Sequence, residues 1–424
     1  MNFHISRALD SRGAVSDIWI ESGEIVATPS KDLHHQVIDA VGLTALPGFV
    51  DLHTHLREPG REDAETVLSG SRAAVAGGYT AISAMPNTLP VADTAGVVEQ
   101  VFRLGKHHNL CDVFPIGAVT LGQNGKHLAE LGAMNQSEAK VRIFSDDGHC
   151  VDDALVMRRA LEYVKTFDGI IAQHAQDPRL TENAQMNEGE VSAKLGLKGW
   201  PAVAEEAIIA RDVLLAEHVD SRLHVCHLTT AGGVDIIRNA KKRGIKVTAE
   251  VTPHHLLLTD EAVESYDPVY KVNPPLRTNR DVQALREGLA DGTIDIIATD
   301  HAPHPQEAKD CEWSAAAFGM LGLETAFSIG YLAMVKSGLM TLDALVESMS
   351  TKPAQIARYD NHGSIAPGKK ANLVLIDLAA EWTVDRAKLH SKSRNTPFHT
   401  MVFPGLVMQT FHNGALVFDR RVDS

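Results

Sequence analysis

Two histidines one residue apart follow an apolar run in the segment GFVDLHTHLREPG, residues 48–60. Residues two positions apart in an extended strand point to the same side, so His53 and His55 can face one ion together. Neutral imidazoles suit zinc and similar divalent ions. The pair therefore predicts a metal-dependent reaction whose centre lies where this strand ends.

Further polar side chains stand at the last positions of other apolar runs, at His174, His227 and Asp300. One such residue is commonly a satisfied polar group, but four histidines and an aspartate at strand ends are hard to obtain by accident. They exceed the ligands of a single zinc ion, so two ions are favoured. Paired ions share a bridging hydroxide and polarise a carbonyl, and a nearby carboxylate can shuttle the proton. The predicted chemistry is hydrolysis of an amide or related C–N bond.

Other histidines near these runs lack the pattern. A strand residue at odd spacing from a ligand faces the other way, and polar turns commonly contain histidine. We therefore expect positions in the core or in turns, rather than ligand roles, for a group of nearby residues: His149, His224, His254, His255 and Cys226.

A repeated strand–helix arrangement must position the ligands. Short apolar runs alternate with helix-period segments at 46–53, 79–85, 112–119, 140–145, 169–174, 222–227, 245–251 and 293–300. Eight strands, each followed by room for a helix, predict an α/β fold of the (β/α)8 TIM-like barrel type. Active sites of such barrels lie at the C-terminal ends of the strands, so the polar residues are expected to converge there.

The two ends of the chain predict more β-structure. Residues 14–28 predict a hairpin, residues 371–378 a strand, and residues 406–419 a hairpin that turns at Asn-Gly. We expect a small β-sandwich domain formed by both termini beside a metal-dependent hydrolase barrel. The expected bounds are 1–46 together with 360–424 for the first and 47–359 for the second.

The bulk composition limits the function classes. The 424 residues carry a formal net charge of −14 with a pI near 5.8, which argues against nucleic acid or an anionic membrane as partner. The four cysteines are scattered without a CxxC pair, so neither a disulfide framework nor a thiolate zinc site is expected. No leader and no transmembrane run stand out, and we expect a cytoplasmic protein.

Seven motifs together carry a family resemblance: DLHTHLREPG, AMPNT, SDDG, CHLTT, VTPHH, NPPLR and ATDHAPH. Over nearly its whole length the chain resembles the amidohydrolase superfamily, and specifically the bacterial type I dihydroorotases. The resemblance implies a cyclic amide hydrolase of de novo pyrimidine synthesis. Its reaction is the reversible, metal-dependent cyclisation of N-carbamoyl-L-aspartate to L-dihydroorotate and water.

The resemblance also implies which residues hold the metal. His53, His55 and Asp300 correspond to ligands of a first ion, and His174 and His227 to ligands of a second. Zinc is the expected metal, with one or two ions per subunit and two favoured. Asp300 is implied as the general acid and base that takes the proton of the bridging hydroxide and passes it to the ring nitrogen.

A bridging ligand is implied at the end of the fourth strand. Many relatives carry a carboxylated lysine there, but this chain has SDDG. Asp147 is implied as the bridge, and Asp146 is the alternative. The missing lysine leaves both one and two ions open, because an aspartate is shorter than a carboxylated lysine.

A substrate-binding set is implied as well. Arg57 lies two residues beyond His55, and its planar fork suits a ring carboxylate, although it could be a solvated surface charge. Asn87 and Asn273 lie beside prolines and could equally form turns. The loop at 302–318 is expected to be mobile over the site. The implied set is His55, Arg57, Asn87, Asn273, His304, Phe318 and Gly319.

Two other functions compete with this one. A hydantoinase or allantoinase would share the fold, but a hydantoin lacks the ring carboxylate that Arg57 and Asn87 would hold. A non-catalytic scaffold of aspartate carbamoyltransferase is disfavoured because every implied ligand is present. The resemblance suggests a homodimer and leaves open an association with aspartate carbamoyltransferase, with or without a need for it in catalysis.

Overall fold

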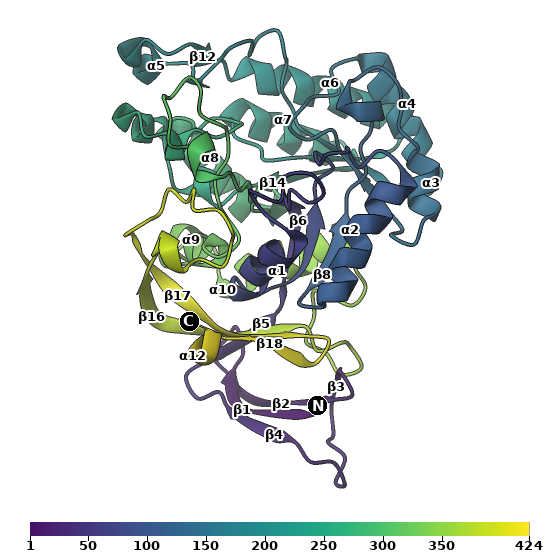
Figure 1. Ribbon diagram of the computed structural model, residues 1–424, viewed down its shortest axis with the longest axis vertical. Helices are drawn as coiled ribbons and strands as arrows, with labels where there is room; N and C mark the ends of the chain where they lie inside the picture. Colours follow the sequence, from purple (N-terminus) through teal and green to yellow (C-terminus); the bar gives the residue numbers. More distant parts are fainter. Residues whose placement is uncertain (424) are drawn as a thin grey trace.

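Within residues 1–423, which the computed structural model describes, the chain forms two parts (Figure 1). One part is an eight-stranded sheet in the order β18-β17-β16-β5-β1-β2-β3, with β4 paired to β1. In Figure 1 its purple N-terminal strands and yellow C-terminal strands lie together below the larger part. Its strands are β1 (Phe3–Leu9), β2 (Val15–Glu21), β3 (Glu24–Val26), β4 (Gln36–Asp39), β5 (Thr44–Pro47), β16 (Leu373–Thr383), β17 (Val402–His412) and β18 (Ala415–Asp419).

The two chain ends meet where β5 and β16 pair antiparallel, with Ala45 opposite Leu375. Strands β2 and β3 form the N-terminal hairpin, and β17 and β18 form the C-terminal one. The second hairpin turns at Asn413 and Gly414, whose φ values of 48° and 78° are the left-handed conformation of a tight turn. Both predicted hairpins are confirmed. The sheet buries an apolar core drawn from both ends: Phe3, Ile5, Ile20, Leu373, Leu375 and Phe411.

The larger part contains a strand in each of the eight apolar runs. These strands are β6 (Phe49–Thr54), β7 (Tyr79–Ala84), β8 (Asp112–Pro115), β9 (Ile143–Phe144), β10 (Ile170–Gln173), β13 (Arg222–Val225), β14 (Val247–Val251) and β15 (Ile296–Ile297). They pair in parallel as β6-β7-β8 and as β15-β14-β13-β10-β9. Parallel bridges from Gly117 to Phe144 and from Thr54 to His301 connect the edges of the two sheets. The predicted α/β class is confirmed.

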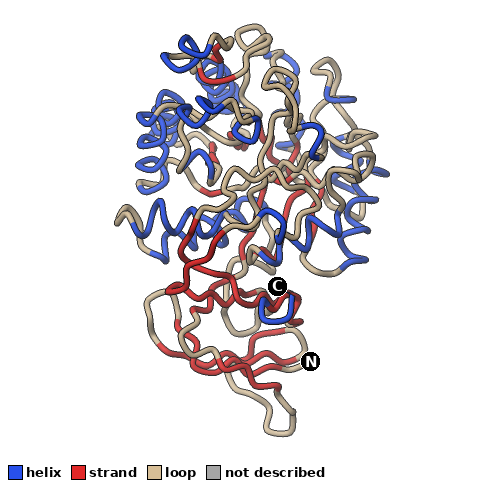
Figure 2. The backbone as a smooth tube through the Cα atoms, turned by 60° about the vertical axis from the view of Figure 1, so that its left-hand side comes forward, coloured by secondary structure: helices blue, strands red, loops and turns tan. Residues whose placement is uncertain are grey.

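Helices follow the strands and lie on the outside of this part, as Figure 2 shows. These helices are α1 (Val67–Ala76), α2 (Ala95–His108), α3 (Leu131–Gln136), α4 (Ala154–Lys165), α5 (Glu190–Leu195), α6 (Val203–Val219), α7 (Ala231–Lys242), α8 (Asn279–Ala290), α9 (Ala326–Gly330), α10 (Leu342–Val346) and α11 (Lys352–Ala357). A short C-terminal helix, α12 (Arg420–Asp423), instead lies beside β17 and β18 in the smaller part (Figure 1). The side chains of Thr66, Asp153, Thr230 and Thr278 cap the first turns of α1, α4, α7 and α8. None of the helices within residues 1–423 combines the length and apolar composition that crossing a bilayer needs.

Candidate active site

Asp147, just beyond β9, contacts all four histidines that follow the strands. Its Oδ1 lies 3.4 Å from His53 Nε2, 3.2 Å from His174 Nδ1 and 3.1 Å from His227 Nε2. Its Oδ2 lies 3.3 Å from His55 Nε2. All five side chains are buried. The parallel strands thus bring residues from β6 and from the loops after β9, β10 and β13 to one point.

This cluster fits a divalent metal centre. One ligand atom each from His53, His55 and Asp147 lie within 4.8 Å of one another, and so do those of Asp147, His174 and His227. Among the described residues, the buried Nε2 of His53 has no hydrogen-bond partner. A buried imidazole nitrogen left unpaired beside a carboxylate is what a bound cation would satisfy. Two groups of three that share Asp147 can accommodate one or two ions.

Asp300 lies at the edge of this cluster. Its Oδ1 is 3.0 Å from His55 Nε2 and 3.5 Å from His53 Nε2. Its φ of +46° is unusual for an aspartate and turns the chain just after β15. Burial alone would raise the pKa of Asp300, but the charge of His53 and the hydrogen bond from His55 outweigh burial and lower it. The carboxylate is therefore ionised and able to accept a proton.

The neighbouring Asp146 serves a different purpose. Its Oδ1 accepts hydrogen bonds from the backbone N–H groups of Val119 at 2.8 Å and Thr120 at 3.0 Å, and its Oδ2 accepts from the Thr120 hydroxyl. These bonds hold the loop after β8 against the end of β9. Asp147 alone of the two aspartates lies against the histidines, so the geometry favours Asp147 as the ligand.

Glu250 is a functional residue that the sequence analysis missed. Its Oε1 accepts from His53 Nδ1 at 2.5 Å and from the backbone N–H of His227 at 3.1 Å. Its Oε2 lies 2.9 Å from Nε2 of His224, a buried residue outside the two groups that share Asp147, as expected for a core position. The only sequence signal was a glutamate inside an apolar strand, VTAEV.

The contacts of Glu250 fix the orientation of His53. In the neutral form of His53 that binds a metal, donation from Nδ1 to the carboxylate leaves Nε2 as the lone-pair nitrogen facing Asp147. The backbone bond to His227 holds that residue in an uncommon conformation, with φ at +31°. Glu250 therefore touches a histidine from each of the two groups that share Asp147.

We expect Glu250→Gln to weaken metal binding by roughly 10- to 100-fold, the usual effect of removing a carboxylate behind a metal-ligating histidine. The amide can still accept from a backbone N–H but no longer enforces the His53 tautomer. The measurement is competition for zinc against a chelating dye. Glu205→Gln is the matched control, because buried Glu205 also accepts backbone bonds, from Thr229 and Thr230, but touches no ligand. Equal zinc affinities in both variants and the parent would contradict this role.

His254 and His255 are buried in a short 3-10 helix, His254–Leu256, rather than in a polar turn, which corrects the expectation from the sequence. His255 is held by Thr252 Oγ1 at 2.7 Å and by the carbonyl of Pro274 at 3.2 Å. Burial, partly opposed by Asp300, lowers the pKa of His254 to about 4, so this imidazole is neutral at physiological pH.

Arg57 is buried beside the cluster, so the alternative of a solvated surface charge is wrong. Its φ is +63°, and its Nε donates to the carbonyl of Pro303 at 3.1 Å. Burial lowers the pKa of Arg57 to about 10, which still leaves the guanidinium charged at neutral pH. Among residues 1–423 it forms no ion pair, so its charge is available to an anionic ligand.

One asparagine contacts a ligand histidine directly, and a second is connected to another ligand histidine through Gln176. Asn87 Oδ1 accepts from His55 Nδ1 at 2.8 Å, which leaves His55 Nε2 facing Asp147 and Asp300. Asn273 Nδ2 donates to Gln176 Oε1 at 3.2 Å, and that same oxygen lies 2.7 Å from His174 Nε2. The buried Oδ1 of Asn273 has no hydrogen-bond partner in the described part of the chain. Both side chains therefore do more than form turns.

His304, Phe318 and Gly319 lie together across the loop of residues 302–318. His304 Nε2 donates to the carbonyl of Phe318 at 2.7 Å. Gly319 has a φ of +143°, and a Cβ there would lie 2.8 Å from both His304 Nε2 and the Cβ of Ala302. Only glycine permits this close approach. Whether the loop moves stays a prediction.

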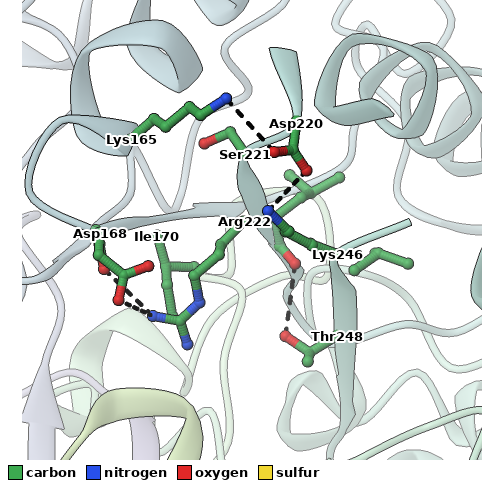
Figure 3. Close-up of a pocket in the computed structure, with 11 residues that line it drawn as sticks. Lys165, Asp168, Ile170, Asp220, Ser221, Arg222, Lys246 and Thr248 are labelled. Atoms are coloured by element: carbon green, nitrogen blue, oxygen red, sulfur yellow. Dashed lines mark hydrogen bonds and ion pairs between the residues drawn. The ribbon is translucent and has the colours of Figure 1, made fainter. Parts of the chain in front are cut away.

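A hollow of about 450 Å³ lies at the N-terminal ends of β10, β13 and β14, away from the histidine cluster at their C-terminal ends (Figure 3). Its charged side chains pair with one another: Lys246 Nζ lies 2.7 Å from Asp220 Oδ1, Lys165 Nζ lies 3.5 Å from Asp220 Oδ2, and Arg222 lies 3.9 Å from Asp168. No metal-binding group within residues 1–423 borders it. It is the supporting end of the strands rather than the reactive one.

Known proteins resemble this chain in sequence and in fold. A family model described as Dihydro-orotase-like matches residues 42–232. Among solved structures, the chain superimposes on a dihydropyrimidinase from Brevibacillus agri with a TM-score of 0.84 at 23% identity, covering 99% of this chain and 96% of that one. An L-hydantoinase from Arthrobacter aurescens gives a TM-score of 0.85 at 26% identity, with the same coverage. These structures show a shared fold.

Sequence relatives are much closer. A protein named dihydroorotase from Streptomyces coelicolor is 64% identical over 405 residues, covering 95% of each chain. Another from Leifsonia xyli is 60% identical over 424 residues, covering 99% of this chain and 97% of the relative. The chain belongs to the dihydroorotase family.

Proposed function

We propose that this chain catalyses the dihydroorotase reaction, the reversible interconversion of N-carbamoyl-L-aspartate and L-dihydroorotate plus water in pyrimidine synthesis. It is a cyclic amide hydrolase, as expected for a chain 64% identical to a dihydroorotase over 95% of its length. The structural observation that carries the proposal is the contact of Asp147 with four buried histidines, beside an ionised Asp300 and an Arg57 that has no ion-pair partner among residues 1–423. Turnover of L-dihydroorotate, compared with hydantoin, is the direct test.

The five ligands His53, His55, Asp147, His174 and His227, with Asp300, would hold the metal. Three imidazole or carboxylate ligands in each group suit zinc, and we propose two ions per subunit with Asp147 shared between them. When bound, such ions polarise a carbonyl and make water acidic enough to act as a nucleophile at neutral pH. Asn87 would orient His55 and Glu250 would orient His53 for this task.

Asp300 would move the proton. Its Oδ1 lies on the same side of His55 as Asp147 and is ionised, so it can take a proton from the attacking water. It would then give that proton to the ring nitrogen as the amide bond breaks. The same carboxyl group serves ring closure in reverse, where it accepts the proton from the attacking ureido nitrogen.

The residues on the other side of the site would bind the substrate. Arg57 supplies a buried charge for the ring carboxylate, with Asn87 and His304 as further contacts. Asn273 presents an unpaired buried oxygen suited to a ring N–H. The backbone at Phe318 and Gly319 would pair with the ring amide. A hydantoin has no ring carboxylate, so this set favours dihydroorotate over the substrates named for the structural neighbours.

We expect Arg57→Met to raise the KM for dihydroorotate by roughly 10- to 100-fold, because it removes a hydrogen-bonded charge worth about 1.5–3 kcal/mol. Since the carboxylate is bound equally in the ground and transition states, kcat should change far less. Steady-state kinetics of ring opening measures both constants. Exposed Arg72 on α1 provides the control, since Arg72→Met should leave KM unchanged. An unaltered KM for Arg57→Met would refute the assignment.

We also propose the domain architecture, the family subtype, the oligomeric state and the location of the protein. The parallel pairs and the two edge bridges support a closed (β/α)8 barrel at 47–359. The single sheet built from both termini supports a small β-domain at 1–46 and 360–424, and its sandwich form stays a prediction. The motifs that resemble bacterial type I dihydroorotases support that subtype. A homodimer, a cytoplasmic location and an association with aspartate carbamoyltransferase are supported by that resemblance alone.

A further inference from the structure

Two buried lysines hold the loop of residues 302–318 through hydrogen bonds to backbone carbonyls. Lys271 lies before the loop in sequence, is 2% exposed, and its Nζ donates to the carbonyls of Trp313 at 2.7 Å and Ser314 at 3.2 Å. Lys309 lies within the loop and is 8% exposed. Its Nζ donates to the carbonyl of Lys271 at 3.0 Å and to that of Ala317 at 2.7 Å. Each lysine thus binds the backbone of the other's segment.

Neither of these ammonium groups forms an ion pair within residues 1–423, although burial of an unpaired charge is costly. An apolar side chain of the same length would fill the space without that cost. What the lysines provide is donors for carbonyl groups that no helix or sheet satisfies. Lys271 Nζ also lies 4.5 Å from the ring centroid of Phe318, which adds a cation–π contact. The two side chains therefore serve to keep the loop in one shape.

That shape places the substrate-facing backbone. The carbonyl of Lys271 accepts from the N–H of Gly319 at 2.9 Å in addition to Lys309 Nζ. Phe318 is held from the other side by His304 at 2.7 Å. Lys271 itself lies two residues before Asn273. One pair of lysines therefore sets the distance between the Asn273 segment and the Phe318–Gly319 backbone.

We propose that Lys271 and Lys309 are positioning residues that hold the loop closed, so that the Phe318–Gly319 backbone and Asn273 meet the substrate ring in a fixed arrangement. The role in substrate binding rests on the proposed function, whereas the closure itself does not. Neither lysine touches the reacting atoms or the metal ligands. Their loss should therefore weaken substrate binding without removing the metal.

The protonation of Lys309 gives an independent check on closure. Burial, reinforced by the charge of Lys271, lowers the pKa of Lys309 to about 7 from the ordinary lysine value of 10.5. The other ionisable groups that face it are Asp267, Cys311 and His304. Below pH 7 the closed loop bears the full cost of a buried ammonium, and this cost falls as the pH rises from 7 toward 10.5. A neutral amine still has two N–H donors for its two carbonyls.

The experiment compares Lys309→Met and Lys271→Met with Lys242→Met, a control on the exposed face of α7. For each zinc-loaded full-length protein we would measure KM and kcat for dihydroorotate, zinc content, and the rate at which a protease cuts the loop. We expect KM to rise roughly tenfold or more in the two loop variants, with kcat changed by less than about threefold. Loop cleavage should accelerate by a similar factor, and zinc content should match the control.

Unchanged KM and unchanged loop cleavage in Lys309→Met would overturn the proposal. If the variants do not fold, amide hydrogen exchange in the wild-type protein decides instead. Protection of the Ala317 and Gly319 amides, corrected for intrinsic exchange, should increase between pH 7 and 9. Protection that does not depend on pH would contradict the proposed role of the two lysines. A wild-type protein that protects these amides in this pH-dependent way but does not turn over dihydroorotate would instead refute the proposed function, while the role of the lysines in holding the loop would stand.

Discussion

Asp147→Asn is expected to lose most of its bound zinc and to slow dihydroorotate turnover by roughly 10³-fold or more. Among residues 1–423, Asp147 is the one carboxylate that contacts all of His53, His55, His174 and His227, so both groups of ligands depend on it. An amide of the same size keeps the packing but not the charge. Zinc content after dialysis, measured with kcat on the same sample, tests the expectation.

Asp146→Asn is the matched control for this change. Asp146 has the same side chain one position earlier, but it holds the loop after β8 through Val119 and Thr120. Its replacement should lower the melting temperature while leaving zinc content at the level of the parent protein. If instead Asp146→Asn loses zinc and Asp147→Asn keeps it, the two aspartates have the opposite roles.

The second large effect is expected for Asp300→Asn. Removing a general acid and base costs about 10²- to 10⁴-fold in rate, and here the loss should fall on kcat. The group of Asp147, His174 and His227 does not include Asp300, so at least one ion should remain bound. Kinetics at saturating dihydroorotate, with zinc content and a melting curve as controls for binding and folding, provide the measurement.

Substantial activity in a folded, zinc-loaded Asp300→Asn protein would rule out the proton-transfer role. A variant that is inactive because it has lost both ions would show that Asp300 acts mainly as a ligand. Asp300→Glu distinguishes these possibilities further. It keeps the charge and the proton-accepting oxygen but moves them, so it should recover metal binding more fully than kcat.

The positions of the strands could be predicted because each is a short apolar run with its polar residue at the end. In parallel strands the carboxyl ends meet at one edge, so spacing alone brought His53, His174 and Asp300 into one candidate site. The hairpins at the termini could be predicted equally well. In the C-terminal one, the pair Asn413–Gly414 favours a tight turn. The ends of the strands were predicted less accurately than their positions. For example, β9 and β15 are much shorter than the apolar runs that contain them.

Other features depend on packing that no local pattern encodes. The sequence alone could not separate Asp146 from Asp147, because both lie in one turn and only the tertiary contacts distinguish them. Glu250 looked like an ordinary strand residue, although a carboxylate in an apolar strand was a usable signal. The burial of Arg57, Lys271 and Lys309 arises from how the loops fold over one another. Charged residues are usually exposed, so composition suggested the opposite.

Reconstitution of the metal-free protein tests the central claim most directly. The purified chain would be stripped with a chelator and titrated with zinc while ring opening of L-dihydroorotate and of hydantoin is followed. We predict no activity without zinc, activity that rises with bound zinc to a plateau at two ions per chain, and a strong preference for dihydroorotate. Full dihydroorotate turnover in the metal-free protein would contradict the metal dependence of the reaction. Equal turnover of hydantoin would contradict the proposed preference for dihydroorotate.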